Sequence, residues 1–242
     1  MQIINQIQKL KQMIDESSRI VFFGGAGVST ESGIPDFRSV DGLYNQTYKY
    51  PPETMLSRSF FDRHTEEFYE FYRDKMICLD AKPNFAHKYL VELEQQGKLR
   101  GIVTQNIDNL HYMAGSKTVY ELHGNVHRNY CMQCGKPHSI KKIIEKLEKV
   151  PHCECGGIIK PDVVLYEEGL DATTMQNTVQ AIQEADMLII AGTSLAVYPA
   201  ASFVQYYRGN KLVVINKSEL SVNADLVIQG AVGEVFSQLV LL

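Results

Sequence analysis

Apolar positions near the start of the chain repeat at helical spacing and then give way to short apolar runs. Ile3, Ile7, Leu10 and Ile14 recur every three to four residues, so residues 3–17 are predicted to form an amphipathic helix. The apolar run at residues 20–23 predicts a buried strand. The same patterns predict further helices at 60–76 (a pair), 84–96, 173–184, 199–207 and from about 233, and further strands at 101–104, 119–122, 163–166, 187–191, 212–215 and 226–228.

This order of elements predicts the fold class. Strands that alternate with helices form a parallel sheet with helices on both faces. We therefore expect an α/β protein whose main domain, residues 1–38, 81–126 and 163–242, carries a smaller inserted module. The insertion has a helical part, residues 39–80, and a cysteine-containing part, residues 127–162, with one helix between two cysteine pairs.

The cysteine pairs predict a metal site. Cys131 and Cys134 are followed after an 18-residue gap by Cys153 and Cys155, and close thiol pairs of this kind hold a tetrahedral Zn²⁺ at about 2.3 Å. Four thiolates leave no open coordination position, so the expected zinc is structural. His152 and Glu154 are alternative ligands for the short second pair, and an iron–sulfur cluster is the alternative occupant.

Charge and hydropathy exclude several classes of partner. The net charge of −4 gives no basic footprint for nucleic acid. No apolar run approaches the roughly 20 residues that cross a bilayer, and the first residues are too polar for a secretory signal. We expect a cytoplasmic protein that binds neither nucleic acid nor a membrane.

Small and polar residues follow several predicted strands. The first strand runs into a glycine-rich stretch, residues 24–33, and then into Pro35-Asp36-Phe37-Arg38; glycines after a strand bring backbone N–H groups up to a phosphate. Other strands end at residues 105–108, at His123, at residues 192–194 and at Asn216. Because the carboxyl ends of parallel strands line one crevice, these groups together predict a nucleotide site.

In content and order these motifs resemble the sirtuins. The matching stretches are residues 25–29, 33–38, 104–108, 123–124, the cysteine pairs and residues 192–195. The resemblance implies a Rossmann-like NAD-binding domain with an inserted zinc-binding and helical module. It also implies an NAD-dependent protein-lysine deacetylase, which transfers the acetyl group of acetyl-lysine proteins or peptides to ADP-ribose and releases nicotinamide. The sequence leaves the oligomeric state open, and we expect a monomer. NAD is then the co-substrate, and one structural Zn²⁺ is expected.

The resemblance also assigns roles to residues. His123 is the expected general base, Asn106 and Asp108 line the nicotinamide pocket, and Phe37 shields the reacting ribose. The cofactor-binding set is Gly25, Ala26, Gly27, Ser29, Thr30, Asp36, Phe37, Arg38, Gln105, Asn106, Ile107, Asp108, His123, Gly192, Thr193, Ser194, Asn216 and Val232.

The acyl-lysine peptide is expected to contact Val164, Tyr166 and Val197, and the acyl pocket Tyr69 and Tyr72. Two positions depart from the family. Glu167 stands where glycine is usual. Relatives that prefer acidic acyl groups carry Tyr-x-x-Arg, whereas here Arg73 comes one residue late, which turns its side chain about 100° around a helix. We therefore expect deacetylation rather than desuccinylation.

Several alternatives use the same motifs. The enzyme could remove other acyl groups, or pass ADP-ribose to a protein as a mono-ADP-ribosyltransferase. A Rossmann dehydrogenase is disfavoured, because Gly25-x-Gly27 is followed by a glycine only at Gly33 and no acidic residue is placed about 20 residues further on for the ribose. A non-catalytic zinc-ribbon adaptor would have no use for the crevice residues.

Overall fold

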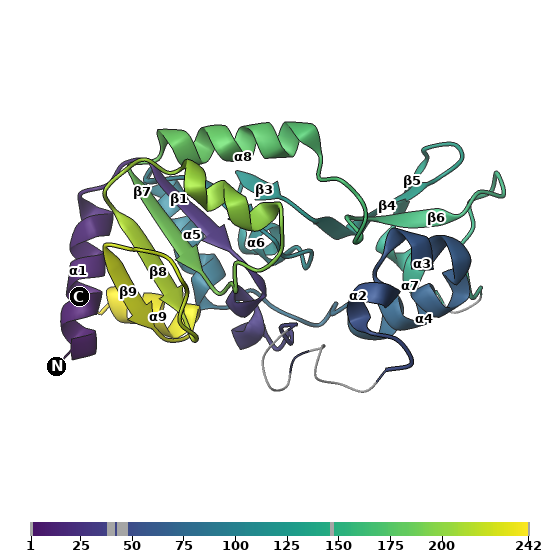
Figure 1. Ribbon diagram of the computed structural model, residues 1–242, viewed down its shortest axis with the longest axis horizontal. Coiled ribbons are helices and arrows are strands. Elements are labelled where there is room, and N and C mark those ends of the chain that lie inside the picture. The colour runs from purple at the N-terminus through teal and green to yellow at the C-terminus, as the bar shows by residue number, and fades with distance from the viewer. Residues whose placement is uncertain (1, 38–41, 43–47, 146–147, 242) are drawn as a thin grey trace.

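A computed structural model describes residues 2–37, 42, 48–145 and 148–241 of the chain. It contains a six-stranded sheet in the order β3-β2-β1-β7-β8-β9, in which every neighbouring pair is parallel (Figure 1). The strands are β1 (Ile20–Gly24), β2 (Leu99–Thr104), β3 (Val119–Glu121), β7 (Met187–Ala191), β8 (Leu212–Asn216) and β9 (Leu226–Gln229).

Helices cover both faces of this sheet. Successive strand residues point to opposite faces, so Phe22 packs with α1 (Gln2–Asp15), α5 (Phe85–Gln95) and α9 (Val232–Leu239), while Phe23 packs with α8 (Ala172–Glu184) and the 3₁₀ segment Ala200–Tyr206. The central strands β1 and β7 are buried throughout, which explains their unbroken apolar sequences. The short helix α6 (Leu110–Ala114) follows β2.

The remaining elements form a small lobe beside the main sheet (Figure 1). An antiparallel sheet, β5-β4-β6, consists of β4 (Gly124–Cys131), β5 (Pro137–Ser139) and β6 (Ile159–Val163). It shares one apolar core with helices from residues 52–75, through side chains such as Phe61, Phe68 and Ile159. These helices are α2 (Pro52–Met55), α3 (Arg58–Arg63) and α4 (Thr65–Lys75), and α7 (Ile140–Ile144) packs nearby.

The predicted fold class is confirmed, and one strand prediction is wrong. The strand expected at 163–166 is β6, which begins four residues earlier and pairs with β4 in the small sheet. The helix predicted between the cysteine pairs is α7, which ends at Ile144. After β1 the chain makes two 3₁₀ turns, Ala26–Val28 and Thr30–Ser32. The proposed domain boundaries stay predictions.

None of the helices within the described residues is both long enough and apolar enough to cross a membrane.

Candidate functional site

Two adjoining cavities lie at the carboxyl ends of the parallel strands. The first, here called the lobe cavity, extends towards the small lobe and is lined by residues 105–108 and 163–168 among others. The second, the sheet cavity, has a volume of about 400 Å³ and lies over the ends of β7 and β8. Six residues line both cavities and mark where they meet: Ala26, Phe37, Gln105, Asn106, His123 and Val197.

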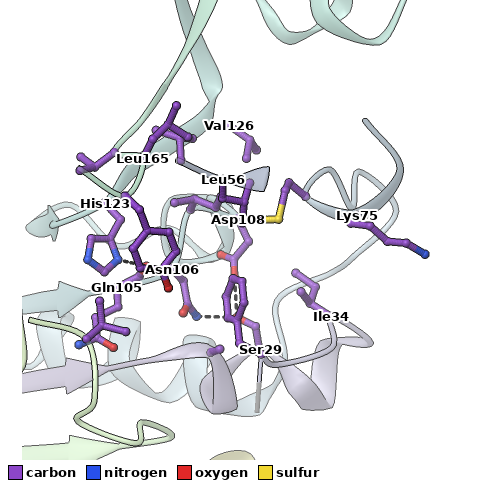
Figure 2. Close-up of a pocket in the computed structure, with 18 of the residues that line it drawn as sticks. Ser29, Ile34, Leu56, Lys75, Gln105, Asn106, Asp108, His123, Val126 and Leu165 are labelled. Carbon is purple, nitrogen blue, oxygen red and sulfur yellow. Dashed lines mark hydrogen bonds between the residues drawn. The ribbon is translucent and has the colours of Figure 1, made fainter. Parts of the chain in front are cut away.

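His123 is held at this junction with a defined tautomer. Its Nδ1 lies 2.9 Å from the carbonyl oxygen of Gln105, which can only accept, so Nδ1 carries the proton and Nε2 keeps its lone pair (Figure 2). Burial lowers the pKa of His123 from its ordinary value, and the hydrogen bond from its ring to Gln105 opposes that shift only in part. At neutral pH the side chain is therefore an uncharged base.

A hydrogen-bonded chain joins the end of β2 to the glycine-rich loop (Figure 2). Asn106 Nδ2 donates to Ser29 Oγ at 3.0 Å, and Ser29 Oγ donates to Asp108 Oδ2 at 2.6 Å. The other carboxylate oxygen of Asp108 accepts from the Leu110 amide at 2.9 Å. Burial raises the pKa of Asp108, while the hydrogen bond from Ser29 opposes the rise. The chain fixes the direction in which the Asn106 amide points.

The glycines of the loop after β1 serve mainly close packing. The Gly25 amide donates to the carbonyl oxygen of Ala191 at 3.2 Å, and the Gly27 amide donates to the carbonyl oxygen of Gly192 at 2.8 Å. Neither N–H is therefore left for a phosphate. A Cβ on Gly27 would lie 2.8 Å from Gly192 Cα. Gly25 itself lines neither cavity. The glycines thus let the loop lie directly against the end of β7.

The sheet cavity has the donors that a dinucleotide needs. Gln105 Nε2 is buried without a hydrogen-bond partner among the described residues, while its Oε1 accepts from Thr193 Oγ1 at 3.2 Å. Because an unpaired buried donor is costly, this amide fits a bound ribose or phosphate oxygen. Further expected cofactor residues line the same cavity: Thr30, Asp36, Gly192, Thr193, Ser194, Asn216 and Val232.

The lobe cavity brings together most of the other predicted residues. Ser29, Ile107, Asp108, Val164 and Tyr166 all line it. Arg38 lies outside the described residues. Sequence reasoning missed several apolar lining residues, most of which come from loops or the ends of helices: Ile34, Leu56, Met76, Cys78, Leu79, Leu165 and, from strand β4, Val126.

Tyr69 and Tyr72 were expected at the acyl pocket, and the structure places them elsewhere. Both are fully buried in the core of the small lobe and line neither cavity. The Tyr69 hydroxyl donates to the Ile159 carbonyl oxygen. Sequence spacing located the helix but not which of its faces turns towards the small sheet.

The four predicted metal ligands converge. The sulfur atoms of Cys131, Cys134, Cys153 and Cys155 all lie within 4.8 Å of one another, with 3.4 Å between Cys131 and Cys155 and 3.7 Å between Cys134 and Cys153. Tetrahedral Zn–S bonds of about 2.3 Å require sulfurs about 3.8 Å apart. The thiols therefore fit a structural zinc, and the Cys-x-Cys spacing does not prevent all four from meeting.

Comparisons with known proteins agree with this geometry. The model of the Sir2 family matches residues 25–199. An NAD-dependent protein deacetylase of Clostridium acetobutylicum is 59% identical, over 99% of this chain and 100% of the relative. One of Staphylococcus aureus is 42% identical, over 91% of each chain. A solved structure described as Sir2 with p53 peptide and NAD⁺ is 38% identical, with a TM-score of 0.84 over 96% of each chain. Another, described as Sir2 bound to acetylated peptide, is 36% identical with the same TM-score and coverage.

Proposed function

This chain belongs to the Sir2 family, and we propose that it is an NAD-dependent protein-lysine deacetylase whose reaction takes place where the two cavities meet. One observation carries the proposal: a neutral histidine and an oriented amide, His123 and Asn106, line both cavities. A dinucleotide in the sheet cavity and an acyl-lysine in the lobe cavity would meet beside them.

In the proposed reaction the acetyl oxygen of acetyl-lysine bonds to the ribose carbon of NAD as the bond from that carbon to nicotinamide breaks. A ribose hydroxyl then bonds to the acetyl carbon, the lysine amine leaves, and one water completes O-acetyl-ADP-ribose. His123 Nε2 takes the proton from a ribose hydroxyl, because its Nδ1–H is committed to Gln105. Asn106 and Asp108 hold the carboxamide of nicotinamide, with Ser29 fixing both side chains. Phe37 lines both cavities and is suited to excluding water from the reacting carbon.

The substrate is an acetyl-lysine protein or peptide. Val164, Tyr166 and Val197 line the lobe cavity and are suited to flank the acyl-lysine. Acetyl is preferred over succinyl, because Arg73 is committed elsewhere. Its guanidinium donates to the carbonyl oxygens of Ile143, Lys149 and Glu148, at 2.6, 2.7 and 3.1 Å. Three of its five N–H donors are thus used within the small lobe, and Arg73 lines neither cavity.

The cysteine cluster holds one structural Zn²⁺, which supplies no chemistry to the reaction and stabilises the small lobe. We place the domain boundaries at residues 1–38, 81–126 and 163–242 for the NAD-binding part, 39–80 for the helical insertion and 127–162 for the zinc-binding module. The protein acts as a cytoplasmic monomer, and its net charge of −4 gives no surface suited to nucleic acid.

The test is to incubate the purified protein with NAD and an acetyl-lysine peptide and to measure nicotinamide, deacetylated peptide and O-acetyl-ADP-ribose. We expect the three products in equal amounts, and slower release from the matching succinyl-lysine peptide. The variant His123→Ala is the matched control. Stable transfer of ADP-ribose to protein without deacetylated peptide would contradict the proposal and favour a mono-ADP-ribosyltransferase.

A further inference from the structure

The segment of residues 164–168 forms one wall of the lobe cavity and is bonded at both ends. The Val164 amide donates to the carbonyl oxygen of His123 at 3.0 Å. The Tyr166 amide donates to the carbonyl oxygen of Leu56 at 3.0 Å, and the Tyr166 carbonyl oxygen accepts from the backbone amide of Arg58 at 2.9 Å. The wall therefore connects the residue that carries the catalytic base with the beginning of helix α3.

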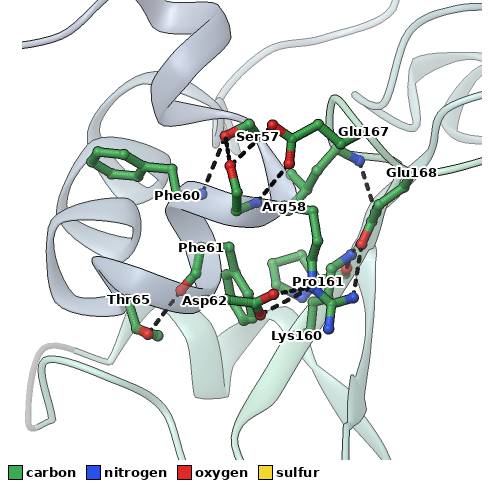
Figure 3. A network of polar contacts seen from close by, with 12 residues as sticks. Ser57, Arg58, Phe60, Phe61, Asp62, Thr65, Lys160, Pro161, Glu167 and Glu168 are labelled. Carbon is green, nitrogen blue, oxygen red and sulfur yellow. Dashed lines mark hydrogen bonds and ion pairs between the residues drawn. The ribbon is translucent and has the colours of Figure 1, made fainter.

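Glu167 adds a side-chain contact to the same helix (Figure 3). Its carboxylate accepts two hydrogen bonds from Ser59, one from the backbone amide at 2.8 Å and one from Oγ at 2.9 Å. Hydrogen bonds to an ionised acceptor are stronger than neutral ones. We call this pair of bonds the Glu167 latch.

The backbone of Glu167 has a conformation that favours glycine. Its φ is +75°, in the left-handed region that a residue with a side chain rarely adopts. Backbone strain of this kind persists only where surrounding contacts hold it in place. Glycine would adopt this conformation without strain but could not form the two side-chain bonds to Ser59.

The neighbouring residue holds the turn by separate contacts. Glu168 Oε2 accepts from the Leu165 amide at 2.9 Å and from Lys160 Nζ at 3.1 Å, and Arg58 Nη1 donates to its Oε1 at 3.1 Å (Figure 3). Removing the Glu167 carboxylate therefore leaves the turn itself supported. Only its connection to the start of α3 is weakened.

We propose that Glu167 is a positioning residue for the peptide substrate, which holds the wall of residues 164–168 in its binding conformation before the peptide arrives. This inference rests on the proposed function. A peptide that binds to an ordered wall loses less free energy in ordering it. The latch therefore acts on peptide affinity, and not on the proton transfer at His123 or on the binding of NAD.

Steady-state kinetics of single variants test the proposal. For Glu167→Ala we expect the KM for an acetyl-lysine peptide to rise about tenfold, with kcat and the KM for NAD within about twofold of the native values. Glu167→Gln keeps one acceptor oxygen, so its peptide KM should lie between those of the native protein and Glu167→Ala. Glu167→Gly relieves the backbone strain without restoring the latch, so its peptide KM should also rise. Glu70→Gln removes an exposed carboxylate from α4, which lies in the same lobe, and should behave as the native protein.

If Glu167→Gly has the same KM for the acetyl-lysine peptide as the native protein, the proposal is overturned, because the glutamate side chain would then be merely tolerated. An equal rise in the KM for NAD also overturns it, because a local latch cannot produce that result. A second measurement is independent of turnover: hydrogen exchange at the Ser59 amide should accelerate in Glu167→Ala but not in Glu70→Gln. Unchanged exchange would contradict the latch.

Fluorescence anisotropy separates this proposal from the proposed function. Native protein that binds the acetyl-lysine peptide but releases no nicotinamide refutes the deacetylase assignment, while weaker peptide binding in Glu167→Ala still supports the latch. Equal peptide affinity of the native and Glu167→Ala proteins refutes the latch alone.

Discussion

Acidification should destabilise this protein through a histidine that lines neither cavity. His87 is fully buried in helix α5, where its Nδ1 accepts a hydrogen bond from the Asn84 amide at 3.3 Å and its ring lies 4.7 Å from that of His111. Burial lowers the pKa of His87 to about 4. It also lowers the pKa of His111, for which neither ring nitrogen has a hydrogen-bond partner among the described residues.

The sign and size of the effect follow from linkage. An unfolded chain protonates His87 near pH 6.5, whereas the folded protein does so only near pH 4. The stability that the neutral His87 contributes is therefore present above pH 6.5 and is lost as the pH falls towards 4. Between pH 7 and pH 5, His87 alone should lower the free energy of unfolding by about 1.8 kcal/mol. His111 contributes with the same sign.

The contribution of His87 to the free energy of unfolding can be measured by urea unfolding of the native protein and of His87→Gln at pH 7 and pH 5. Glutamine at this position can still accept from the Asn84 amide, so the capping arrangement at the start of α5 is kept while the titrating group is lost. The native protein should lose about 1.8 kcal/mol more than the variant, because zinc release and carboxylate titration affect both alike. The exposed His64→Gln is the control and should follow the native protein. An equal loss in native protein and His87→Gln would refute the reasoning.

Three further predictions concern the site and the lobe. Because burial lowers the pKa of His123, the acid limb of a kcat/KM profile should lie below pH 6.5, and His123→Ala should lower kcat/KM by roughly 10²–10⁴-fold; a limb above pH 7 would contradict the assignment of the base. Chelation of zinc should unfold the small lobe, seen as lost near-ultraviolet circular dichroism that Zn²⁺ restores; an unchanged spectrum after verified metal removal would exclude a structural role. Gly27→Ala should lower the free energy of unfolding in urea by about 2–3 kcal/mol, because the new Cβ would lie against the backbone of Gly192, which cannot give way as a side chain can. Gly33→Ala has open space and should lower it by only about 1 kcal/mol, for its positive φ; equal losses in the two variants would show that the contact with Gly192 has no effect.

The parallel sheet could be predicted because its strands are buried on both faces. The run at residues 187–191 is apolar without interruption, which a half-exposed strand would not be. Strand β6 could not be predicted in the same way. Its apolar residues alternate with Lys160 and Asp162, as in a strand buried on one face only, but Pro161 in the middle argues against a strand.

Contacts between residues far apart in the sequence also limited what could be predicted. Glu31 accepts hydrogen bonds from the Gly233 and Glu234 amides, and so caps a helix 202 positions further along the chain. No local pattern encodes such a pair. In the same way the motif residues predicted which groups line the crevice, whereas the positions of Tyr69 and Tyr72 depended on how a helix is rotated about its axis.

His123, the proposed base, also lies at the boundary between the two sheets. Strand β3 of the parallel sheet ends at Glu121, and β4 of the antiparallel sheet begins at Gly124. Gly124 has a φ of +80°, and a Cβ there would lie 1.9 Å from the Asp162 carbonyl oxygen, so no other residue fits at this turn. His123 is thus the link between the two sheets, and its position depends on both of them. Its ring is bonded to Gln105, which follows β2, and its carbonyl oxygen to Val164, which follows β6.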